Sequence, residues 1–248
     1  MRYDKILFDL DNTLIDFDDA ERTSLKICFE KFSIPYKDKY NEIYHEINDK
    51  MWKLLEKGLI ERKVLIVKRF EELFEVLGVK GVLPEEFNSE YLSNIKNGKK
   101  LMPNAVQTVK AVYDLGAKCY LVTNGNKIVQ KNRLEGQPFM EYISGVAISE
   151  DVGYKKPDKE FFIGAEKTFN VKFDSKTLVV GDSLTSDILG GINAGIDTCF
   201  VNVKNQAKNP EITPTYEITS LLDLIEIVKK KKMMREFTHH FFFFYNFY

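Results

Sequence analysis

The feature that most constrains the fold is the alternation of short apolar runs with helical segments in the second half of the chain. The runs at residues 118–123 (KCYLVT) and 178–181 (LVVG) have the length of buried strands. Strands separated by helices predict βαβ units and a parallel sheet covered on both faces. The run at residues 5–9 (KILFD) has the same character, so we assign it to the same sheet. Further strands are expected at residues 142–148 and 198–201, and helices around residues 129–134, 159–169, 186–193 and 221–228.

The segment between the first strand and residue 98 has a different pattern of apolar residues. Its apolar residues recur at helical spacing, as at Leu25, Cys28 and Phe29, and glycines stand at plausible helix ends. We expect about four helices here and no strand. The predicted organisation is an α/β core of residues 1–15 and 98–230, a helical insertion of residues 16–97 and an irregular aromatic tail of residues 231–248.

Composition argues against several classes of partner. The 248 residues carry 36 Lys+Arg and 37 Asp+Glu, so no excess of positive charge draws the chain to a nucleic acid polymer. No apolar run approaches the roughly 20 residues that span a membrane, and the start of the chain lacks the apolar stretch of a signal peptide. The three cysteines lie far apart without CxxC spacing, as in a reducing compartment. We therefore expect a cytoplasmic protein, monomer or homodimer, that binds neither nucleic acid nor membrane.

The aromatic end of the chain has two interpretations. Residues 237–248 (FTHHFFFFYNFY) are almost wholly aromatic and follow a basic run at residues 229–232. The segment is either a short anchor for a membrane or partner, or an extension beyond the last helix, since chain ends tolerate change. We favour the extension.

Histidine usage narrows the chemistry. Two of the three histidines lie in the tail, which leaves His45 alone in the body of the chain. A Ser-His-Asp or Cys-His hydrolase would depend on that residue, and a zinc site rich in histidine is excluded. Catalysis is therefore expected to use carboxylates and hard metal ions.

An acid pair follows the first strand in the motif DLDNT. Asp9 and Asp11 stand two residues apart, and residues at this spacing share a face of an extended chain. Ligands of parallel α/β sheets bind at the carboxyl ends of the strands. Two adjacent carboxylates need a cation or a shared proton. The alternative is that Asp11 merely forms a turn with Asn12.

A second acid pair follows a later strand in VVGDSLTSD. Asp182 ends the strand and Asp187 lies five residues on. The carboxylates of Asp9, Asp11 and Asp182 can then converge on one hard cation, and ligation by oxygen atoms suits Mg²⁺. The alternative for Asp182 is an N-cap of the following helix.

Two further motifs can hold an anion. LVTNG delivers Thr123 and Asn124 from a strand into a glycine turn, where a hydroxyl and backbone N–H groups are available. In YKKPD, Pro157 biases Lys156 to an extended backbone from which the ammonium can reach a phosphate. The alternatives are an ordinary turn and a solvated surface lysine.

Taken in order, these motifs resemble those of the haloacid dehalogenase superfamily. That superfamily carries DxDx(T/V), a Thr or Ser after a strand, a Lys, and a pair of acids in a GDxxxD-like motif. The matching residues are Asp9, Asp11, Thr13, Thr123, Lys156, Asp182 and Asp187, although the last pair is spaced GDxxxxD. The resemblance extends to about residue 230 and implies a Rossmann-like parallel-sheet core, with the helical insertion as a C1 cap.

A narrower resemblance is to the pyrimidine 5'-nucleotidases of this superfamily. It is carried by residues 148–157 and 179–195 and by Asn48, Trp52 and Gly58 in the helical segment. Phosphoglycolate and sugar-phosphate phosphatases share much of the pattern, and a phosphomutase would use the same acids. A haloacid dehalogenase does not need an acid at Asp11. A non-catalytic binding protein would be expected to lose members of the acid set.

The resemblance implies a phosphatase mechanism for the acids. Asp9 would attack phosphorus and form an aspartyl-phosphate. Asp11 would protonate the leaving oxygen and later take a proton from water. Mg²⁺ would be held by the Asp9 carboxylate, the Asp11 backbone carbonyl and Asp182.

The remaining motif residues would bind and select the substrate. The phosphate oxygens would be held by Thr123, Asn124 and Lys156. Thr13 would support the loop, and Asp187 would orient Lys156 or a metal-bound water. Phe17 and Trp52 are candidates for substrate selection, with packing as the alternative role for each. The expected substrate is a small phosphate monoester such as a nucleoside monophosphate.

Overall fold

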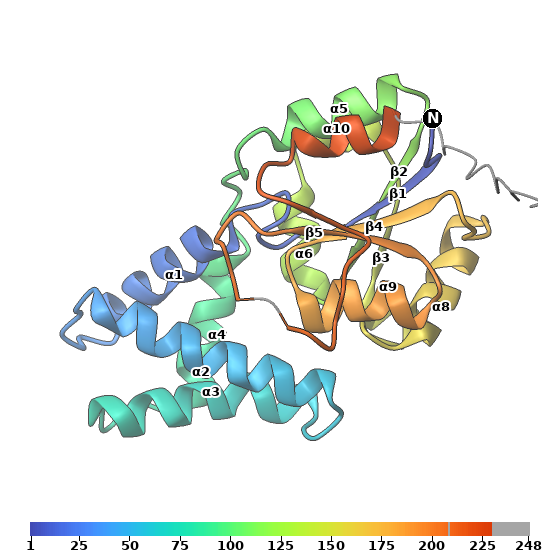
Figure 1. Cartoon of the computed structure of the whole chain (residues 1–248). Coiled ribbons are helices and arrows are strands. Elements are labelled where there is room, and N and C mark those ends of the chain that lie inside the picture. The colour runs from blue at the N-terminus through green and yellow to red at the C-terminus, as the bar shows by residue number, and fades with distance from the viewer. Residues whose placement is uncertain (208, 230–248) are drawn as a thin grey trace, which may run out of the picture.

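The computed structural model describes residues 1–207 and 209–229. Within these residues, six parallel strands form one sheet in the order β3-β2-β1-β4-β5-β6 (Figure 1). This is the parallel α/β core that the alternating pattern predicts. The strands are β1 (Lys5–Phe8), β2 (Lys118–Thr123), β3 (Ile143–Ile148), β4 (Thr177–Gly181), β5 (Asp197–Val201) and β6 (Tyr216–Ile218).

Both faces of the sheet are covered because successive strand residues point to opposite sides. In β1, Ile6 and Phe8 join one apolar cluster while Leu7 joins the other, and all three side chains are fully buried. Figure 1 shows one pair of helices above the sheet and another pair below it. The upper pair is α5 (Ala105–Asp114) and α10 (Asp223–Lys229), and the lower pair is α8 (Lys159–Phe169) and α9 (Leu189–Asn193).

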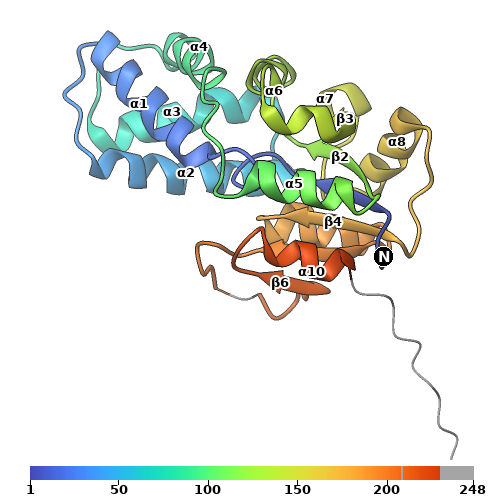
Figure 2. The same cartoon turned by 90° about the horizontal axis from the view of Figure 1, so that it is seen from above.

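A separate bundle of four helices follows β1 and lies beyond the carboxyl ends of the strands (Figures 1 and 2). Its interior is aromatic: Phe87 packs against Phe29 and Phe70, and Tyr44 stacks on Phe70 with ring centroids 5.2 Å apart. We call this bundle the cap. Its helices are α1 (Phe17–Lys31), α2 (Lys39–Glu56), α3 (Arg62–Leu77) and α4 (Pro84–Ile95).

The two chain segments that connect the cap to the sheet run side by side. Ile15 forms a bridge with Leu101, and the backbone N–H of Asp16 donates to the carbonyl of Lys100 at 2.8 Å. The cap is therefore inserted without separating the strands on either side of it. β1 and β2 remain paired in the sheet, with Ile6 opposite Cys119.

The strands and helices expected from the sequence are present, but several elements were missed. The segment of α5 contains three valines and a threonine, which have weak helix propensity, so packing on the sheet decides its conformation. The helix expected at residues 186–193 is instead a π-helix, η2 (Leu184–Ile188), followed by α9. The other elements not anticipated are β6, α7 (Ser149–Val152) and the short helix η1 (Pro138–Tyr142).

Two expectations concern membranes and the end of the chain. Among the described residues, no helix combines the length and apolar character that crossing a membrane requires. The aromatic tail predicted at residues 231–248 lies outside the described residues.

Candidate active site

Three carboxylates meet at the carboxyl end of the sheet. Asp9 follows β1 and Asp182 follows β4, and these strands are paired with Phe8 opposite Val180. Asp187 reaches the same point from η2, and one oxygen of each acid lies within 4.8 Å of the other two. We call Asp9, Asp182 and Asp187 the acid cluster.

Gly181 makes room for this arrangement. A Cβ atom at that position would lie 2.2 Å from a carboxylate oxygen of Asp187. The glycine before Asp182 in the GD motif therefore has a packing role, because any side chain there would displace Asp187.

A buried lysine neutralises part of the acid cluster. The Nζ atom of Lys156 lies 2.6 Å from an oxygen of Asp9 and 2.7 Å from one of Asp187, and it also donates to the Val122 carbonyl at 2.8 Å. The lysine is only 1% exposed, so it is not the solvated surface residue considered as an alternative. Its ammonium is held between Asp9 and Asp187, two of the motif acids.

Asn124 holds the backbone of this lysine. Its side-chain oxygen accepts from the Lys156 N–H at 2.8 Å, and its amide nitrogen donates to the Lys156 carbonyl at 2.8 Å. The turn after β2 thus positions the lysine-bearing loop between α7 and α8. The sequence placed Asn124 among the phosphate ligands and did not predict this contact.

Burial and mutual repulsion control the protonation of the site. Burial raises the pKa of the Asp9 carboxyl to about 7, with Asp187 adding to the effect and Lys156 opposing it. Burial, with repulsion from Asp9 and Asp187, also raises the pKa of Asp182 well above its ordinary value. Burial lowers the pKa of Lys156, but the charges of Asp187 and Asp9 outweigh it and raise that pKa. Lys156 supplies one positive charge to three carboxylates, so without a further cation Asp9 and Asp182 tend toward their protonated forms.

Asp11 is not a member of the acid cluster. Its carboxylate forms an ion pair with Arg133 and accepts a hydrogen bond from Gln130 at 2.7 Å. Both partners lie on α6 (Lys127–Leu134), where spacing of three residues puts them on one face. Arg133 is fully buried, so the ion pair fixes the orientation of the Asp11 carboxylate.

Sequence reasoning missed Gln130 and Arg133. The available signal was a pair of polar residues at helical spacing in a short helix that follows the LVTNG turn. That signal is weak, because such a pair is usually a solvated helix face. Only the packing of α6 against the loop after β1 gives the pair its role.

The two threonines of the motifs are both buried. Thr123 accepts hydrogen bonds from the backbone N–H of Gly125 at 3.2 Å and from Gln130 at 2.9 Å. The hydroxyl of Thr13 has no hydrogen-bond partner among the described residues. Asn12 adopts a φ of 56°, so the turn weighed as an alternative exists beside the acid pair.

A cavity of about 460 Å³ joins the acid cluster to the cap. Phe17 and Trp52, the two candidates for substrate selection, both contribute to its wall. Each also packs: Arg133 lies over the Phe17 ring at 5.4 Å, and Arg62 lies over the Trp52 ring at 5.2 Å. Packing and substrate contact are therefore compatible roles for Phe17 and Trp52, because an arginine covers one face of each ring.

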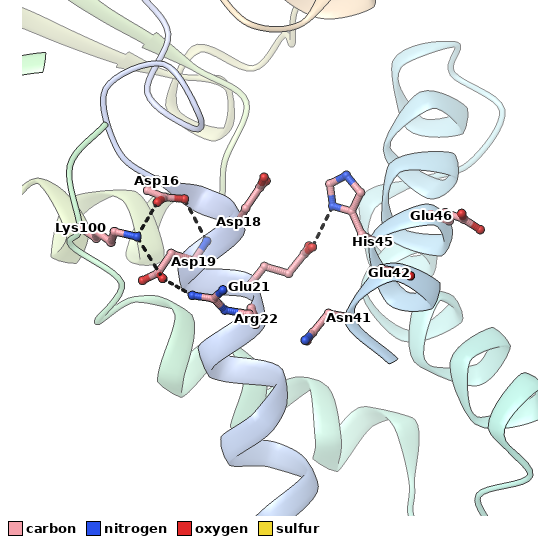
Figure 3. A pocket seen from close by; sticks show the side chains of 10 residues that line it. All are labelled: Asp16, Asp18, Asp19, Glu21, Arg22, Asn41, Glu42, His45, Glu46 and Lys100. Carbon is pink, nitrogen blue, oxygen red and sulfur yellow. Dashed lines mark hydrogen bonds and ion pairs between the residues drawn. The ribbon is translucent and has the colours of Figure 1, made fainter. Parts of the chain in front are cut away.

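An acidic groove lies next to this cavity, between α1 and α2 (Figure 3). In Figure 3, Glu21 and His45 point toward one another, and Glu21 accepts from the His45 ring at 3.0 Å. This hydrogen bond raises the pKa of His45. Lys100 pairs with Asp16 at 2.9 Å and Asp19 at 3.2 Å. Most residues that line the groove are acidic, so it would repel an anion. The neighbouring cavity contains the ammonium of Lys156 and is the better site for an anion.

The last residue of α2 contributes another acid to the cavity. Burial raises the pKa of Glu56 to about 7, and its Oε2 atom has no hydrogen-bond partner among the described residues. The folded protein therefore prefers the protonated form of this carboxyl.

We expect Glu56→Gln to change the pH dependence of stability. The pKa of Glu56 is higher in the folded protein than its ordinary value of 4.5. The wild type therefore has its full stability below about pH 4.5 and loses some as the pH rises to about 7. The glutamine does not titrate, so the variant should gain stability relative to wild type across this interval. Urea unfolding at pH 4.5 and pH 8 measures the difference, and a constant difference would contradict the assignment.

Comparison with known proteins agrees with this geometry. The chain is 35% identical over 232 residues to the HAD-hydrolase YfnB of Bacillus subtilis (strain 168), covering 92% of this chain and 96% of YfnB. It is 34% identical to the pyrimidine 5'-nucleotidase YjjG of Escherichia coli (strain K12), covering 93% of this chain and all of YjjG. It is also 33% identical to the pyrimidine 5'-nucleotidase PynA of Streptococcus pneumoniae (strain ATCC BAA-255 / R6), covering 93% and 97% of the two chains.

The fold comparison extends the likeness to a solved structure. The crystal structure of YfnB bound to magnesium superposes with a TM-score of 0.87 at 33% identity, covering 93% of this chain and all of YfnB. The family model of the haloacid dehalogenase-like hydrolases matches residues 6–201, a range that includes every motif residue discussed above. The protein therefore belongs to the haloacid dehalogenase-like hydrolase family.

Proposed function

We propose that the protein is a Mg²⁺-dependent phosphatase that hydrolyses small phosphate monoesters through an aspartyl-phosphate. The observation that carries this proposal is the buried Lys156 ammonium between Asp9 and Asp187, at the floor of the cavity. It combines a carboxylate nucleophile with a fixed cation for the phosphoryl oxygens.

Asp9 is the proposed nucleophile. Its carboxylate ends β1 and faces the cavity, and one oxygen is engaged by Lys156 at 2.6 Å. Attack on phosphorus requires the ionised form. Because burial and Asp187 favour the protonated form, the site needs additional positive charge when an anionic substrate binds.

Asp11 is the proposed general acid and base. It lies two residues after Asp9 and also lines the cavity, where Arg133 and Gln130 fix its carboxylate. In the first step Asp11 gives a proton to the leaving ester oxygen. In the second it accepts a proton from the water that hydrolyses the aspartyl-phosphate.

The residues present fit a magnesium ion. Three clustered carboxylates supply hard oxygen ligands. The raised pKa values of Asp9 and Asp182 support a role for a cation that would keep both groups ionised. Asp9, Asp182 and the backbone carbonyl of Asp11 would hold the ion, while Asp187 orients Lys156. When bound, Mg²⁺ neutralises the acids and polarises the phosphoryl group. The related YfnB has been crystallised with magnesium.

The phosphate is assigned to the turn after β2 and to the lysine. Thr123 and Asn124 both line the cavity beside Lys156. The Lys156 ammonium supplies charge, the turn supplies backbone N–H groups, and Asn124 keeps the lysine loop in register with the turn. Buried Thr13 is assigned to support of the loop after β1.

The substrate we favour is a pyrimidine nucleoside monophosphate. Two relatives that match nearly the full chain, YjjG and PynA, are named pyrimidine 5'-nucleotidases. The cavity is lined by Phe17 and Trp52, and aromatic rings can stack on a base. The cytoplasmic location and the monomeric or dimeric state stay predictions from the sequence.

Asp9→Asn should abolish turnover. The amide cannot form the acyl-phosphate, so phosphate release from p-nitrophenyl phosphate should fall by roughly 10⁴-fold or more. Asp114→Asn, which changes an exposed acid at the end of α5, is the matched control and should keep normal activity. Near-normal turnover by the Asp9 variant would refute the covalent scheme.

Removal of divalent metal should stop the reaction. Excess EDTA is expected to eliminate phosphate release, and added Mg²⁺ should restore it. Mg²⁺ should also raise the melting temperature of the metal-free protein, because the ion binds the folded acid cluster. Full activity in excess EDTA would count against the metal assignment.

A substrate panel decides between the nucleotidase and its main alternatives. We expect kcat/KM to be highest for UMP, dUMP or dTMP among nucleoside monophosphates, sugar phosphates and phosphoglycolate. A strong preference for phosphoglycolate or a sugar phosphate would overturn the substrate while leaving the phosphatase assignment in place. Transfer of the phosphate without its release would indicate a phosphomutase.

A further inference from the structure

One side chain bridges the proposed general acid and a proposed phosphate ligand. The Nε2 atom of Gln130 donates to the Oδ2 atom of Asp11 at 2.7 Å and to the Thr123 hydroxyl oxygen at 2.9 Å. Its Oε1 atom accepts from Arg133 at 3.1 Å. Gln130 is 1% exposed and, like Asp11 and Thr123, lines the cavity. The amide therefore connects a group assigned to the leaving oxygen with a group assigned to the phosphoryl oxygens.

The partners of this amide fix the direction in which it points. Only the amide nitrogen can donate to the Asp11 carboxylate, and only the amide oxygen can accept from the Arg133 guanidinium. Both hydrogens on Nε2 are then used, one by Asp11 and one by Thr123. A flipped amide would set its oxygen against the carboxylate and its nitrogen against the guanidinium. The Gln130 amide therefore has one favourable orientation.

The bridge also restricts the direction of the Thr123 proton. The hydroxyl oxygen accepts from the Gly125 N–H at 3.2 Å and from Gln130 at 2.9 Å, which uses both of its lone pairs. Thr123 is 1% exposed, and within the described residues its proton has no acceptor. Because Thr123 lines the cavity, this proton is available to a phosphoryl oxygen there. Gln130 thus keeps the hydroxyl in the role of a donor.

The same contacts distinguish the two oxygens of Asp11. One oxygen is paired with the buried guanidinium of Arg133, which favours negative charge on that oxygen. The Oδ2 atom instead contacts the neutral amide of Gln130 and keeps a second lone pair. Oδ2 is therefore the oxygen better suited to carry a proton. As the Asp9 oxygen bonds to phosphorus and the ester P–O bond breaks, this proton would pass to the leaving oxygen.

Gly125 makes room for the bridge. A Cβ atom at this position would lie 2.1 Å from the Nε2 atom of Gln130 and 2.4 Å from its amide carbon. The φ angle of Gly125 is not positive, so no left-handed backbone conformation calls for glycine here. The three atoms nearest to the added Cβ all belong to Gln130. The missing side chain thus permits the close approach of this amide.

We propose that Gln130 is a positioning residue for both proton transfer and phosphate binding. Its amide presents the Oδ2 atom of Asp11 to the leaving oxygen and turns the Thr123 proton toward a phosphoryl oxygen. The proposal rests on the proposed phosphatase function, because both groups act on a phosphate ester. A single residue of α6 then aligns the acid with the phosphate ligand.

Two esters that differ in their need for a proton test the contact with Asp11. p-Nitrophenolate leaves as a stable anion, whereas the more basic phenolate gains more from a general acid. We expect Gln130→Ala to lower kcat/KM for phenyl phosphate about tenfold more than for p-nitrophenyl phosphate. This is part of the roughly 10²–10⁴-fold that a positioned acid supplies, since Arg133 still holds Asp11. The ratio of the two values does not depend on the fraction of folded protein.

Inorganic phosphate tests the contact with Thr123. It has no leaving group, so its competitive inhibition constant reports phosphate binding without acid catalysis. We expect Gln130→Ala to raise this constant by about fivefold to tenfold, the effect of one misdirected hydrogen bond. This constant is also independent of the concentration of active enzyme.

Gln137→Ala is the matched control. Gln137 is 7% exposed, and its amide nitrogen donates to the carbonyls of Lys99 and Arg133 at 3.0 and 3.1 Å. It is not among the residues that line the cavity. Loss of this buried amide should lower stability without changing the ester ratio or the phosphate constant.

Gly125→Ala supplies an independent variant. The new Cβ atom should push the Gln130 amide away, so both readouts should shift as they do in Gln130→Ala. When Gln130 is already alanine, the added methyl group meets no amide, and Gly125→Ala should cause no further shift. Gly125→Ala alone serves as the test if Gln130→Ala does not fold.

Three results would overturn the proposal. An unchanged ester ratio and phosphate constant in Gln130→Ala and Gly125→Ala would exclude positioning by the amide. A change in only one readout would break the link between the acid and the phosphate ligand. An equal shift in Gln137→Ala, or a further shift when Gly125→Ala is added to Gln130→Ala, would assign the effects to packing. A wild type that releases phosphate from neither ester is a different result, which refutes the phosphatase itself.

Discussion

The arrangement of the site depends on a buried lysine that must be paired. Lys156 is almost inaccessible to water, and a lone ammonium in that position would be strongly unfavourable. Its pairing with Asp9 and Asp187 joins the end of β1, the loop before α8 and the π-helix after β4. Segments nearly 180 residues apart in sequence are thus held to a common point by charge. Lys156 brings one positive charge to three carboxylates, so a divalent cation beside them would let these acids stay ionised and would also attract an anionic substrate.

The cap completes the site without disturbing the sheet. Its two connections run side by side at Ile15 and Leu101, so β1 and β2 stay paired although β1 ends at Phe8 and β2 begins only at Lys118. Contacts between cap and core are specific and polar. Arg62 donates to the carbonyl of Asn124 at 2.6 Å, and buried Arg133 contacts both Asp11 and the ring of Phe17. The position of the cap is therefore coupled to the groups that surround the phosphate.

The α/β core and the cap contribute different kinds of residue to the cavity. The core supplies strand-end carboxylates and one buried ammonium, which suit phosphoryl chemistry. The cap supplies aromatic rings and a hydrogen-bonding network, which suit recognition of a leaving group. In this division, substitutions in the cap can alter substrate choice without removing the reactive acids. Such an arrangement is compatible with the different hydrolase names carried by relatives of similar identity.

The sequence alone determined the sheet, the helical insertion and the strand-end acids, because apolar runs that end in Asp9, Thr123 and Asp182 indicate strand ends directly. Parallel pairing then obliges those residues to meet at one edge. The sequence also predicted that the Asp11 carboxylate joins Asp9 and Asp182, whereas Asp187 takes that place in the structure. Only the tertiary structure decided how they are held. Three sets of contacts join residues from different elements. Arg133 and Gln130 hold Asp11, and Asn124 holds Lys156. In the cap, Arg69 donates to Asn48. Such contacts depend on how helices pack. Local sequence periodicity does not indicate which polar side chains will form hydrogen bonds or ion pairs with each other.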